Sequence, residues 1–376
     1  MKRKRTVAIS TWSLQDGLNY GCSLQSAGMQ KLVKDCGYKP ITIYHIFIPN
    51  SKDRKLFGNR GKYLISRGRA YLWTKHRFLR YASKYIKLSK VCYTDHDVIE
   101  YVKKRCDILL CGSDSIWKAC FICSLFLWDY KELDGYPRLA YAPSLQSSKE
   151  LAYGNIDQAI KRFDALSGRE PVVEQFLKEY TDKKVETVLD PTLAVSESFW
   201  ENQVRNYRLI KEDYVLCYVL SEAEMHRIAI DEIKKQYNVD KVVYINTNYI
   251  DKRQGFTDYR GEAYSKIVGP REFLSLIKYS KAVCTDSFHG VALSIVFRKE
   301  FYMFGRDRLW EQGADYRALN LFERLQIGNR MVYKNEDIKK LQTIEWDVVE
   351  KRLFEERKKS VKYLQEALDL CNTKCK

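Results

Sequence analysis

Long hydrophobic runs are missing from this sequence of 376 residues. No apolar stretch approaches the roughly 20 residues that a helix needs to cross a bilayer. The start, Met1-Lys2-Arg3-Lys4-Arg5, leads into only a short apolar piece that Ser10 and Thr11 interrupt, which is not the pattern of a signal peptide. We therefore expect a cytoplasmic protein without a membrane span or a signal peptide.

Residues that hold metals and cofactors are scarce or wrongly spaced. Only five histidines are present, and Cys120-Phe121-Ile122-Cys123 is the one Cys-x-x-Cys, with no second pair at zinc-site spacing. Asp95-His96-Asp97 precedes an apolar helical pattern and is interpreted as a helix start. Neither a dinucleotide fingerprint nor a Walker loop is found. We expect no metal and no cofactor, and the eleven cysteines are typical of reduced thiols.

Positive charge is abundant, with a formal net charge of +17, and most of the excess is local. The segment 52–90 holds thirteen Lys or Arg and one acid, Asp53, interleaved with seven aromatic residues. This basic aromatic segment suits an anionic membrane surface or a nucleic-acid backbone. A solvated helix pair that packs its aromatics on the domain is the alternative. No base-reading motif accompanies it, so we expect no nucleic-acid partner. Lys75, Arg77 and Arg80 are candidate contacts with a membrane or acceptor.

Short apolar runs alternate with helical patterns along the chain, which predicts an α/β fold. Strands are predicted at 6–10, 41–48, 107–111, 138–142, 185–189, 214–220, 241–246, 281–284 and 300–304. Helices are predicted at 24–35, 157–166, 171–179 and 222–237. We expect two βα-rich domains, 1–205 with the basic aromatic segment inserted, and 206–346. A long amphipathic helix and tail at 347–376 would cross back to the first domain.

The corner Val283-Cys284-Thr285-Asp286-Ser287-Phe288-His289-Gly290 joins a predicted buried strand to a predicted helix. In open α/β sheets, ligands bind at the carboxyl ends of strands, where helix N-termini offer N–H groups to anions. Asp286 or Ser287 could simply cap the helix. Capping does not explain His289, whose imidazole can transfer protons near neutral pH.

A second polar turn follows the strand predicted at 107–111. Gly112, Ser113 and Asp114 stand there, and their backbone N–H groups and hydroxyls could hold a phosphate or an acceptor sugar. A tight turn followed by a helix cap explains the same residues equally well. Asp190-Pro191-Thr192, at the end of a later strand, is interpreted as structural.

Several short motifs occur along the chain in a fixed order. They are Asn19-Tyr20-Gly21, Gly112-Ser113-Asp114-Ser115-Ile116-Trp117, Tyr141-Ala142-Pro143-Ser144, Gly168-Arg169-Glu170, Val188-Leu189-Asp190-Pro191-Thr192-Leu193, Gly269-Pro270-Arg271-Glu272-Phe273-Leu274 and Thr285-Asp286-Ser287-Phe288-His289-Gly290. Each motif alone is weak, but the ordered set resembles the polysaccharide pyruvyl transferase family over most of the chain.

The resemblance implies a GT-B-like fold, in which two Rossmann-type domains face each other across a cleft. It also implies a reaction in which the enolpyruvyl group of phosphoenolpyruvate moves onto two hydroxyls of a sugar and phosphate is released. Acceptors in the family are cell-surface glycans or their lipid-linked precursors, such as an undecaprenyl-diphosphate-linked oligosaccharide. Such an acceptor would bring the protein to the inner face of the membrane.

The family's histidine falls on His289, which we expect to act as acid and base, with Asp286 or Ser287 orienting it. Ser287 and Gly290 are candidate substrate-binding residues of the same corner. Guanidinium groups bind carboxylates and phosphates in forked geometry, so Arg169 is the first choice for the donor and Arg271 a weaker one.

The corner departs from one branch of the family, which has Arg-Leu-His-Gly with that Arg on the donor. Here Ser287 and Phe288 precede His289. The second anion-binding group is therefore open between Arg271, Lys266, Arg306 and the basic aromatic segment. Two other functions also stay open at this point: a nucleotide-sugar glycosyltransferase of the GT-B type, and a non-catalytic protein that binds a membrane or nucleic acid.

Overall fold

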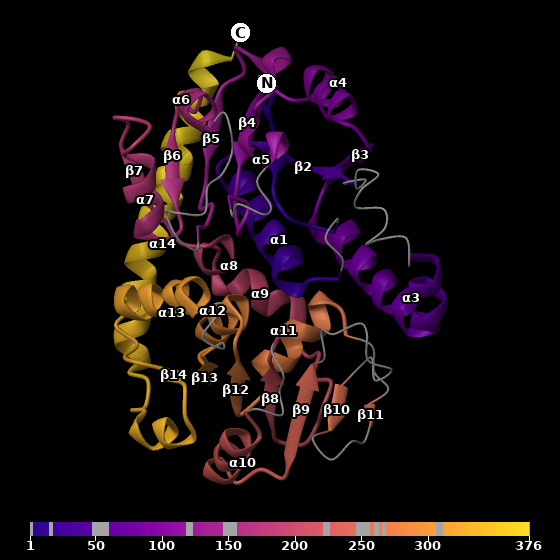
Figure 1. Cartoon of the computed structure of the whole chain (residues 1–376), viewed down its shortest axis with the longest axis vertical. Coiled ribbons are helices and arrows are strands. Elements are labelled where there is room, and N and C mark those ends of the chain that lie inside the picture. Colours follow the sequence, from indigo (N-terminus) through magenta and orange to yellow (C-terminus); the bar gives the residue numbers. More distant parts are fainter. Residues whose placement is uncertain are drawn as a thin grey trace. The chain divides into compact units, whose positions relative to one another are not determined.

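The computed structural model is an α/β structure (Figure 1). The residues that it describes are 3–14, 18–46, 60–117, 123–145, 156–220, 226–245, 256–258, 263–264, 268–305 and 311–375. The chain divides into two units, each with its own sheet. Unit 1 comprises Met1–Ile48, Ala82–Val195 and Leu353–Lys376, and unit 2 comprises Pro49–Tyr81 and Ser196–Arg352.

Unit 1 is built on a parallel five-stranded sheet with the strand order β3-β2-β1-β4-β5. The strands are β1 (Thr6–Ser10), β2 (Lys39–His45), β3 (Leu88–Cys92), β4 (Ile108–Cys111) and β5 (Arg138–Ala140). β4 is buried along its whole length, as expected for an apolar interior strand of a parallel sheet. A small parallel pair, β6 (Leu166–Gly168) and β7 (Val185–Thr187), lies next to β5.

Helices and loops connect these strands in βα order. They are α1 (Tyr20–Asp35), α4 (Asp95–Arg105), α5 (Ser124–Leu127), α6 (Ile156–Lys161), α7 (Pro171–Leu177) and α8 (Pro191–Ala194), with the 3-10 turn η1 (Lys131–Leu133). α4 begins with a capping box between Thr94 and Asp97. The segment Asp95-His96-Asp97 is therefore a helix start, as predicted.

Unit 2 contains a seven-stranded sheet with the order β11-β10-β9-β8-β12-β13-β14. The strands are β8 (Tyr214–Tyr218), β9 (Lys241–Ile245), β10 (Phe256–Asp258), β11 (Ala263–Tyr264), β12 (Ala282–Thr285), β13 (Glu300–Phe304) and β14 (Met331–Val332). The five strands from β9 to β14 are parallel, and β10 and β11 are antiparallel additions at one edge. β12 is the middle one of the five parallel strands and is fully buried.

The helices of unit 2 include most of one long helix, α3, which comes from an earlier segment of the chain than the other helices. They are α3 (Arg60–Tyr85), α9 (Glu197–Val204), α10 (Arg227–Gln236), α11 (Pro270–Lys278), α12 (Phe288–Val296) and α13 (Glu311–Leu325), with the 3-10 turn η4 (Asn335–Lys340). α14 (Trp346–Lys374) starts in unit 2 and continues into unit 1. There its Tyr363 hydroxyl donates to Ala140 O at 2.8 Å, and Leu189 N donates to Ser360 Oγ at 2.9 Å.

The division into units differs from the expected domain bounds in two ways. It falls between Val195 and Ser196 instead of at residue 205, because α9 is tied to α11. One of these contacts joins Arg271 Nε to Gln203 O at 2.8 Å. In addition, Pro49–Tyr81 belongs to unit 2, although the basic aromatic segment was expected within the first domain. Ion pairs and hydrogen bonds between residues far apart in the sequence join this segment to unit 2, and no local sequence pattern reveals such contacts.

Secondary structure also departs from the prediction around residue 166. The helix expected at 157–166 ends at Lys161, and Leu166–Gly168 is the strand β6. Leu166 is followed by a Ser-Gly pair, and so short a sequence does not distinguish a helix from a strand. The strands β3, β10, β11 and β14 were not predicted, and each is short or lies in a polar sequence.

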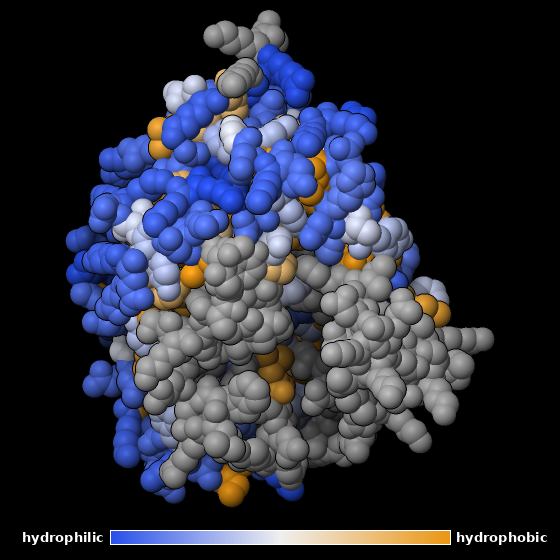
Figure 2. Space-filling view, turned by 45° about the horizontal axis from the view of Figure 1, so that its top comes forward, coloured by the Kyte–Doolittle hydropathy of each residue, from blue (hydrophilic) through white to orange (hydrophobic). Residues whose placement is uncertain are grey.

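The surface facing the viewer in Figure 2 is mostly hydrophilic where it is described, with hydrophobic residues showing only in small areas. Among the described helices, none combines the length and the apolar character needed to cross a bilayer. None of the described cysteines forms a disulfide. Cys120, half of the Cys-x-x-Cys, lies outside the described residues.

Candidate functional site

The corner predicted from the sequence follows β12, the middle one of the five parallel strands of unit 2. β12 ends at Thr285, whose hydroxyl donates to Tyr218 O at 2.6 Å and accepts from Ser287 N at 3.1 Å. Ser287 is the N-cap residue of α12, although its side chain makes no capping bond, and His289 is the second residue of the helix. The corner therefore lies at the carboxyl end of a parallel strand, where α/β sheets bind ligands.

Gly290 allows α12 to approach the end of β12 closely. A Cβ atom at this position would lie 2.4 Å from Thr285 Oγ1 and 3.0 Å from Thr285 Cβ. The hydroxyl of Thr285 cannot move away without losing its bonds to Tyr218 and Ser287. Only glycine fits here, and the fit fixes the first turn of the helix that carries His289.

Asp286 is buried, and its Oδ1 accepts a hydrogen bond from Leu220 N at 2.7 Å. This bond ties the corner to the segment that follows β8, the neighbouring strand. The side chain of His289 is 8% exposed, and its ring meets that of Phe288 edge-on, with the centroids 5.5 Å apart. The catalytic role expected for Asp286 and His289 stays a prediction.

The structure also brings a cation to this corner that the sequence did not indicate. Arg317, in α13, places its guanidinium carbon 5.9 Å from the centroid of the Phe288 ring. α13 packs against α12, so a guanidinium lies beside the residue next to His289. Phe288 is also the first residue of α12, whose first turn carries the positive end of the helix dipole.

Arg271, the weaker candidate for the donor, packs in another direction. Its Nε donates to Gln203 O at 2.8 Å, and its guanidinium carbon lies 3.9 Å from the centroid of the Tyr207 ring. Both contacts hold it against the segment around the end of α9. Lys266 and Arg306, two other candidates for the second anion-binding group, lie outside the described residues.

The second group of predicted residues lies in unit 1, in the turn that follows β4. Gly112 has a φ of 144°, and a Cβ atom on it would lie 1.9 Å from Tyr141 O, so this position requires glycine. Ser113 Oγ donates to Asp190 Oδ2 at 3.2 Å, and Asp114 Oδ1 accepts from Ser115 N at 2.8 Å. These contacts hold the turn at the carboxyl edge of the sheet.

Arg169 follows β6 and lies beneath the same turn, 3% exposed. Its Nε donates to Glu170 Oε1 and its Nη1 to Asp190 Oδ2, both at 2.8 Å, and Asp114 Oδ1 is 4.0 Å from Nη1. Burial favours the neutral form of this guanidinium, but attraction by Glu170, Asp190 and Asp114 outweighs burial and raises its pKa. The carboxylates thus keep Arg169 charged and fix the plane of its guanidinium.

Several buried polar atoms near this edge of unit 1 have no hydrogen-bond partner among the described residues. They are Ser13 Oγ, Ser23 Oγ, Gln25 Oε1 and Glu170 Oε2. Ser13 follows β1, Ser23 and Gln25 stand in the first turns of α1, and Glu170 follows β6. Buried polar groups are usually satisfied, so such a concentration is typical of a place that receives water or a polar ligand.

The three candidate membrane contacts lie in α3 and differ in their surroundings. Lys75 and Arg80 are exposed. Arg77 is partly buried and forms an ion pair and hydrogen bond with Glu272 in α11. That pairing gives Arg77 a structural contact within unit 2.

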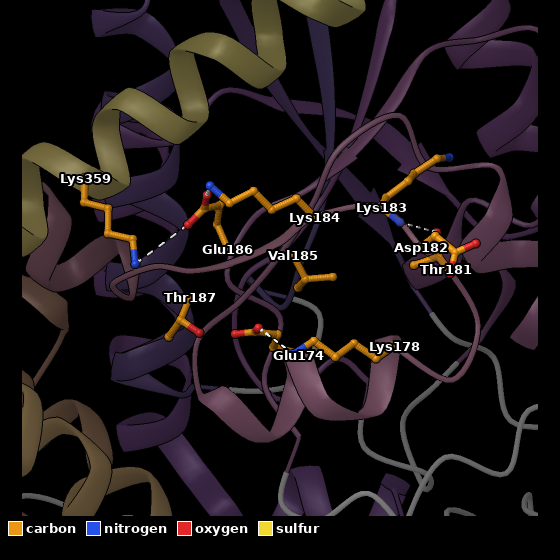
Figure 3. A pocket seen from close by; sticks show the side chains of 10 residues that line it. All are labelled: Glu174, Lys178, Thr181, Asp182, Lys183, Lys184, Val185, Glu186, Thr187 and Lys359. Carbon is orange, nitrogen blue, oxygen red and sulfur yellow. Dashed lines mark hydrogen bonds and ion pairs between the residues drawn. The ribbon is translucent and has the colours of Figure 1, made fainter.

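A pocket of about 570 Å³ opens on unit 1 between α7, β7 and α14 (Figure 3). Its basic side chains pair within the unit: Lys178 with Glu174 at 3.0 Å, and Lys359 with Glu186 at 3.7 Å. Lys183 donates to the carbonyl oxygen of Phe163 at 2.5 Å. None of the predicted site residues lines it, so we assign no function to this pocket.

Comparison with solved structures defines the class of fold. UDP-GlcNAc 2-epimerase from Neisseria meningitidis, bound to UDP-GlcNAc, matches with a TM-score of 0.52 and 10% identity, covering 97% of this chain and 100% of that one. UDP-GlcNAc 2-epimerase from Methanocaldococcus jannaschii matches with a TM-score of 0.50 and 12% identity, covering 90% and 91%. At these identities the likeness shows the fold alone, and the chain has a GT-B-like α/β fold.

The family follows from the sequence itself. The family model of polysaccharide pyruvyl transferase matches residues 19–308, which is most of the chain. The chain therefore belongs to the polysaccharide pyruvyl transferase family, and the resemblance stated above is confirmed. A search of curated protein sequences finds no match.

Proposed function

We propose that this protein transfers the enolpyruvyl group of phosphoenolpyruvate onto two hydroxyls of a sugar, forming a pyruvate ketal and releasing phosphate. The observation that carries the proposal is the position of His289. It stands in the first turn of α12, at the carboxyl end of the central parallel strand β12, in a chain of the pyruvyl transferase family. An imidazole is the side chain that most often serves as a general acid and base.

The reaction needs proton transfer in both of its steps. In the first, C3 of phosphoenolpyruvate takes a proton, a sugar hydroxyl oxygen bonds to C2, and that hydroxyl loses its proton. In the second, the bond from C2 to the phosphate oxygen breaks, a second hydroxyl oxygen bonds to C2, and its proton leaves. We assign these transfers to His289, with Asp286 holding the corner in place through Leu220 N.

The donor carries a carboxylate and a phosphate, which need cationic partners. We assign one of these to Arg317, whose guanidinium lies beside Phe288, together with the first turn of α12. This residue takes the part of the Arg that some relatives carry in the corner itself. Arg169 remains the second candidate, because Glu170 and Asp190 hold its guanidinium in one orientation, as forked recognition of an anion requires.

The acceptor is a polyhydroxylated glycan, either a cell-surface glycan or its undecaprenyl-diphosphate-linked precursor. We assign its sugar to the carboxyl edge of unit 1, where Gly112, Ser113 and Asp114 form the turn after β4. The buried oxygens of Ser13 and Glu170 support this assignment, since sugar hydroxyls can donate to and accept from such atoms. No metal or cofactor has a part in this proposal.

Incubation of the protein with phosphoenolpyruvate and a panel of glycosyl acceptors tests the proposal. Phosphate release and a product with the mass of an added pyruvyl ketal are expected. His289→Ala should lower turnover by about 10²- to 10⁴-fold while the protein stays folded. His96→Ala, at an exposed histidine in the first turn of α4, is the matched control and should keep full activity.

A nucleotide-sugar reaction is the competing possibility, and thermal unfolding separates the two. A ligand that binds the native state raises the unfolding temperature with its concentration. Stabilisation by phosphoenolpyruvate is expected. Stabilisation by a uridine nucleotide alone, with no effect of phosphoenolpyruvate, would count against the pyruvyl donor.

A further inference from the structure

Helix α3 is held on unit 2 by one side, which defines how the helix is rotated about its axis. Phe78 and Tyr81 are buried on that side, and the Tyr81 hydroxyl donates to Gln203 Oε1 at 2.9 Å. Arg77 pairs with Glu272 on the same side. A Cβ atom on Gly269 would lie 2.7 Å from Arg77 Cβ, so backbone and helix approach closely here. These contacts therefore also determine which residues lie on the opposite side of the helix.

That opposite side carries large apolar side chains in contact with solvent. Leu72 is 61% exposed, Trp73 is 59% exposed and Leu79 is 43% exposed. Single exposed apolar residues are ordinary on a protein surface, but three within two turns of one helix are not. The observation calls for a partner that covers them.

Basic side chains stand beside these apolar ones in a regular order. At about 100° per residue, the exposed residues between Leu72 and Arg80 span about 160° of the helix circumference, and the buried ones occupy the opposite arc. The exposed order around the helix is Lys75, Leu79, Leu72, His76, Arg80 and Trp73. The two leucines thus lie in the middle, with Lys75 on one side and Arg80 on the other. We call these six residues the outer face of α3.

We propose that the outer face of α3 docks on the surface of an anionic lipid bilayer, with the helix axis in the membrane plane. Leu72 and Leu79 would enter the boundary between headgroups and acyl chains, and Trp73 would lie at headgroup level, where tryptophan is favoured. Lys75 and Arg80 would extend to the lipid phosphates on either side. This inference does not depend on the reaction proposed above.

Charge complementarity selects lipid over nucleic acid. A nucleic-acid backbone would attract Lys75 and Arg80, but it would leave Leu72 and Leu79 in water between them. Arg77, the third basic residue in this part of the helix, is engaged with Glu272 on the inner side. The outer face therefore supplies a narrow apolar centre with flanking charge, which fits a membrane interface.

Flotation of the full chain with vesicles tests the proposal. Binding is expected to vesicles of phosphatidylcholine mixed with phosphatidylglycerol, and much less to phosphatidylcholine alone. Each neutralised basic residue near the surface should weaken binding about fivefold, so Lys75→Gln/Arg80→Gln should weaken it about 25-fold. Leu72→Ser/Leu79→Ser should release the protein at high salt, where electrostatic attraction is screened. Phe354→Ser, at a residue that is 64% exposed in α14, is the matched control and should bind like the unaltered chain.

A fluorescence measurement distinguishes insertion from loose attraction. Lipids brominated on their acyl chains should quench tryptophan emission of the bound protein, and Trp73→Phe should remove most of that quenching. Four other tryptophans, Trp12, Trp117, Trp128 and Trp200, are buried and inaccessible to lipid. The proposal is overturned if the chain ignores anionic vesicles, if both outer-face variants bind as well as the control, or if only a nucleic acid binds.

Discussion

The position of Arg317 beside Phe288 predicts how its substitution will change the binding of phosphoenolpyruvate. If its guanidinium binds an anionic group of the donor, Arg317→Lys keeps the charge but loses the forked geometry. We expect the KM for phosphoenolpyruvate to rise about tenfold, equivalent to about 1.4 kcal/mol, with a smaller change in kcat. Steady-state kinetics with varied phosphoenolpyruvate measure this. Arg324→Lys, further along α13, is the control, and an equal rise in both variants would contradict the assignment.

Asp190 shows how much stability one buried carboxylate can carry in unit 1. It accepts hydrogen bonds from Arg169, Ser113 and the backbone N–H of Thr192. Asp190→Ala would leave the charge of Arg169 incompletely paired in a dry environment. We expect the free energy of unfolding to fall by about 3 kcal/mol, measured by urea denaturation.

The control for this measurement is a carboxylate in an exposed ion pair. Asp157 pairs with Lys161 at the surface of α6, and such pairs contribute little. Asp157→Ala should therefore change the free energy of unfolding by no more than about 0.5 kcal/mol. Equal losses in the two variants would show that burial of the Arg169 network carries no special stability.

At the scale of elements, the junction of β12 with α12 depends on one glycine. In a helix, Gly→Ala usually stabilises by about 1 kcal/mol, because alanine has the higher helix propensity. At Gly290 the new methyl group would collide with Thr285 Oγ1, so Gly290→Ala should instead destabilise by about 1–3 kcal/mol and displace the first turn of α12. Thermal unfolding together with turnover tests this, and a more stable, fully active variant would refute it.

The same scale shows what local sequence can predict. β1, β8, β12 and β13 were expected within two residues of their observed bounds, because uninterrupted apolar runs produce buried parallel strands. β6 was missed because three residues, Leu166-Ser167-Gly168, hold no periodicity. Its strand conformation comes from pairing with β7, which lies too far along the chain for a local sequence pattern to reveal the contact.

The candidate site, like the strands, could be predicted from the sequence only in part. His289 and Gly290 could be found from the sequence because they stand in one motif at the end of one strand. Arg317 could not, because it reaches the corner only through the packing of α13 on α12. Nor does any local pattern show that Arg169 is flanked by Asp190, a residue that its own motif does not contain.

For the whole molecule, surface docking and catalysis should cooperate when the acceptor is lipid-linked. This expectation combines the proposed reaction with the proposed membrane docking. A docked enzyme meets an acceptor confined to the same surface, which raises the effective acceptor concentration without any new contact at the site. Leu72→Ser/Leu79→Ser should then lower turnover about tenfold on an undecaprenyl-diphosphate-linked acceptor in anionic vesicles. Turnover on a soluble oligosaccharide acceptor should not change, since neither leucine is among the residues assigned to the reaction. Equal rates for variant and unaltered chain in vesicles would separate the outer face of α3 from catalysis, and equal losses on both acceptors would place the defect in the fold instead.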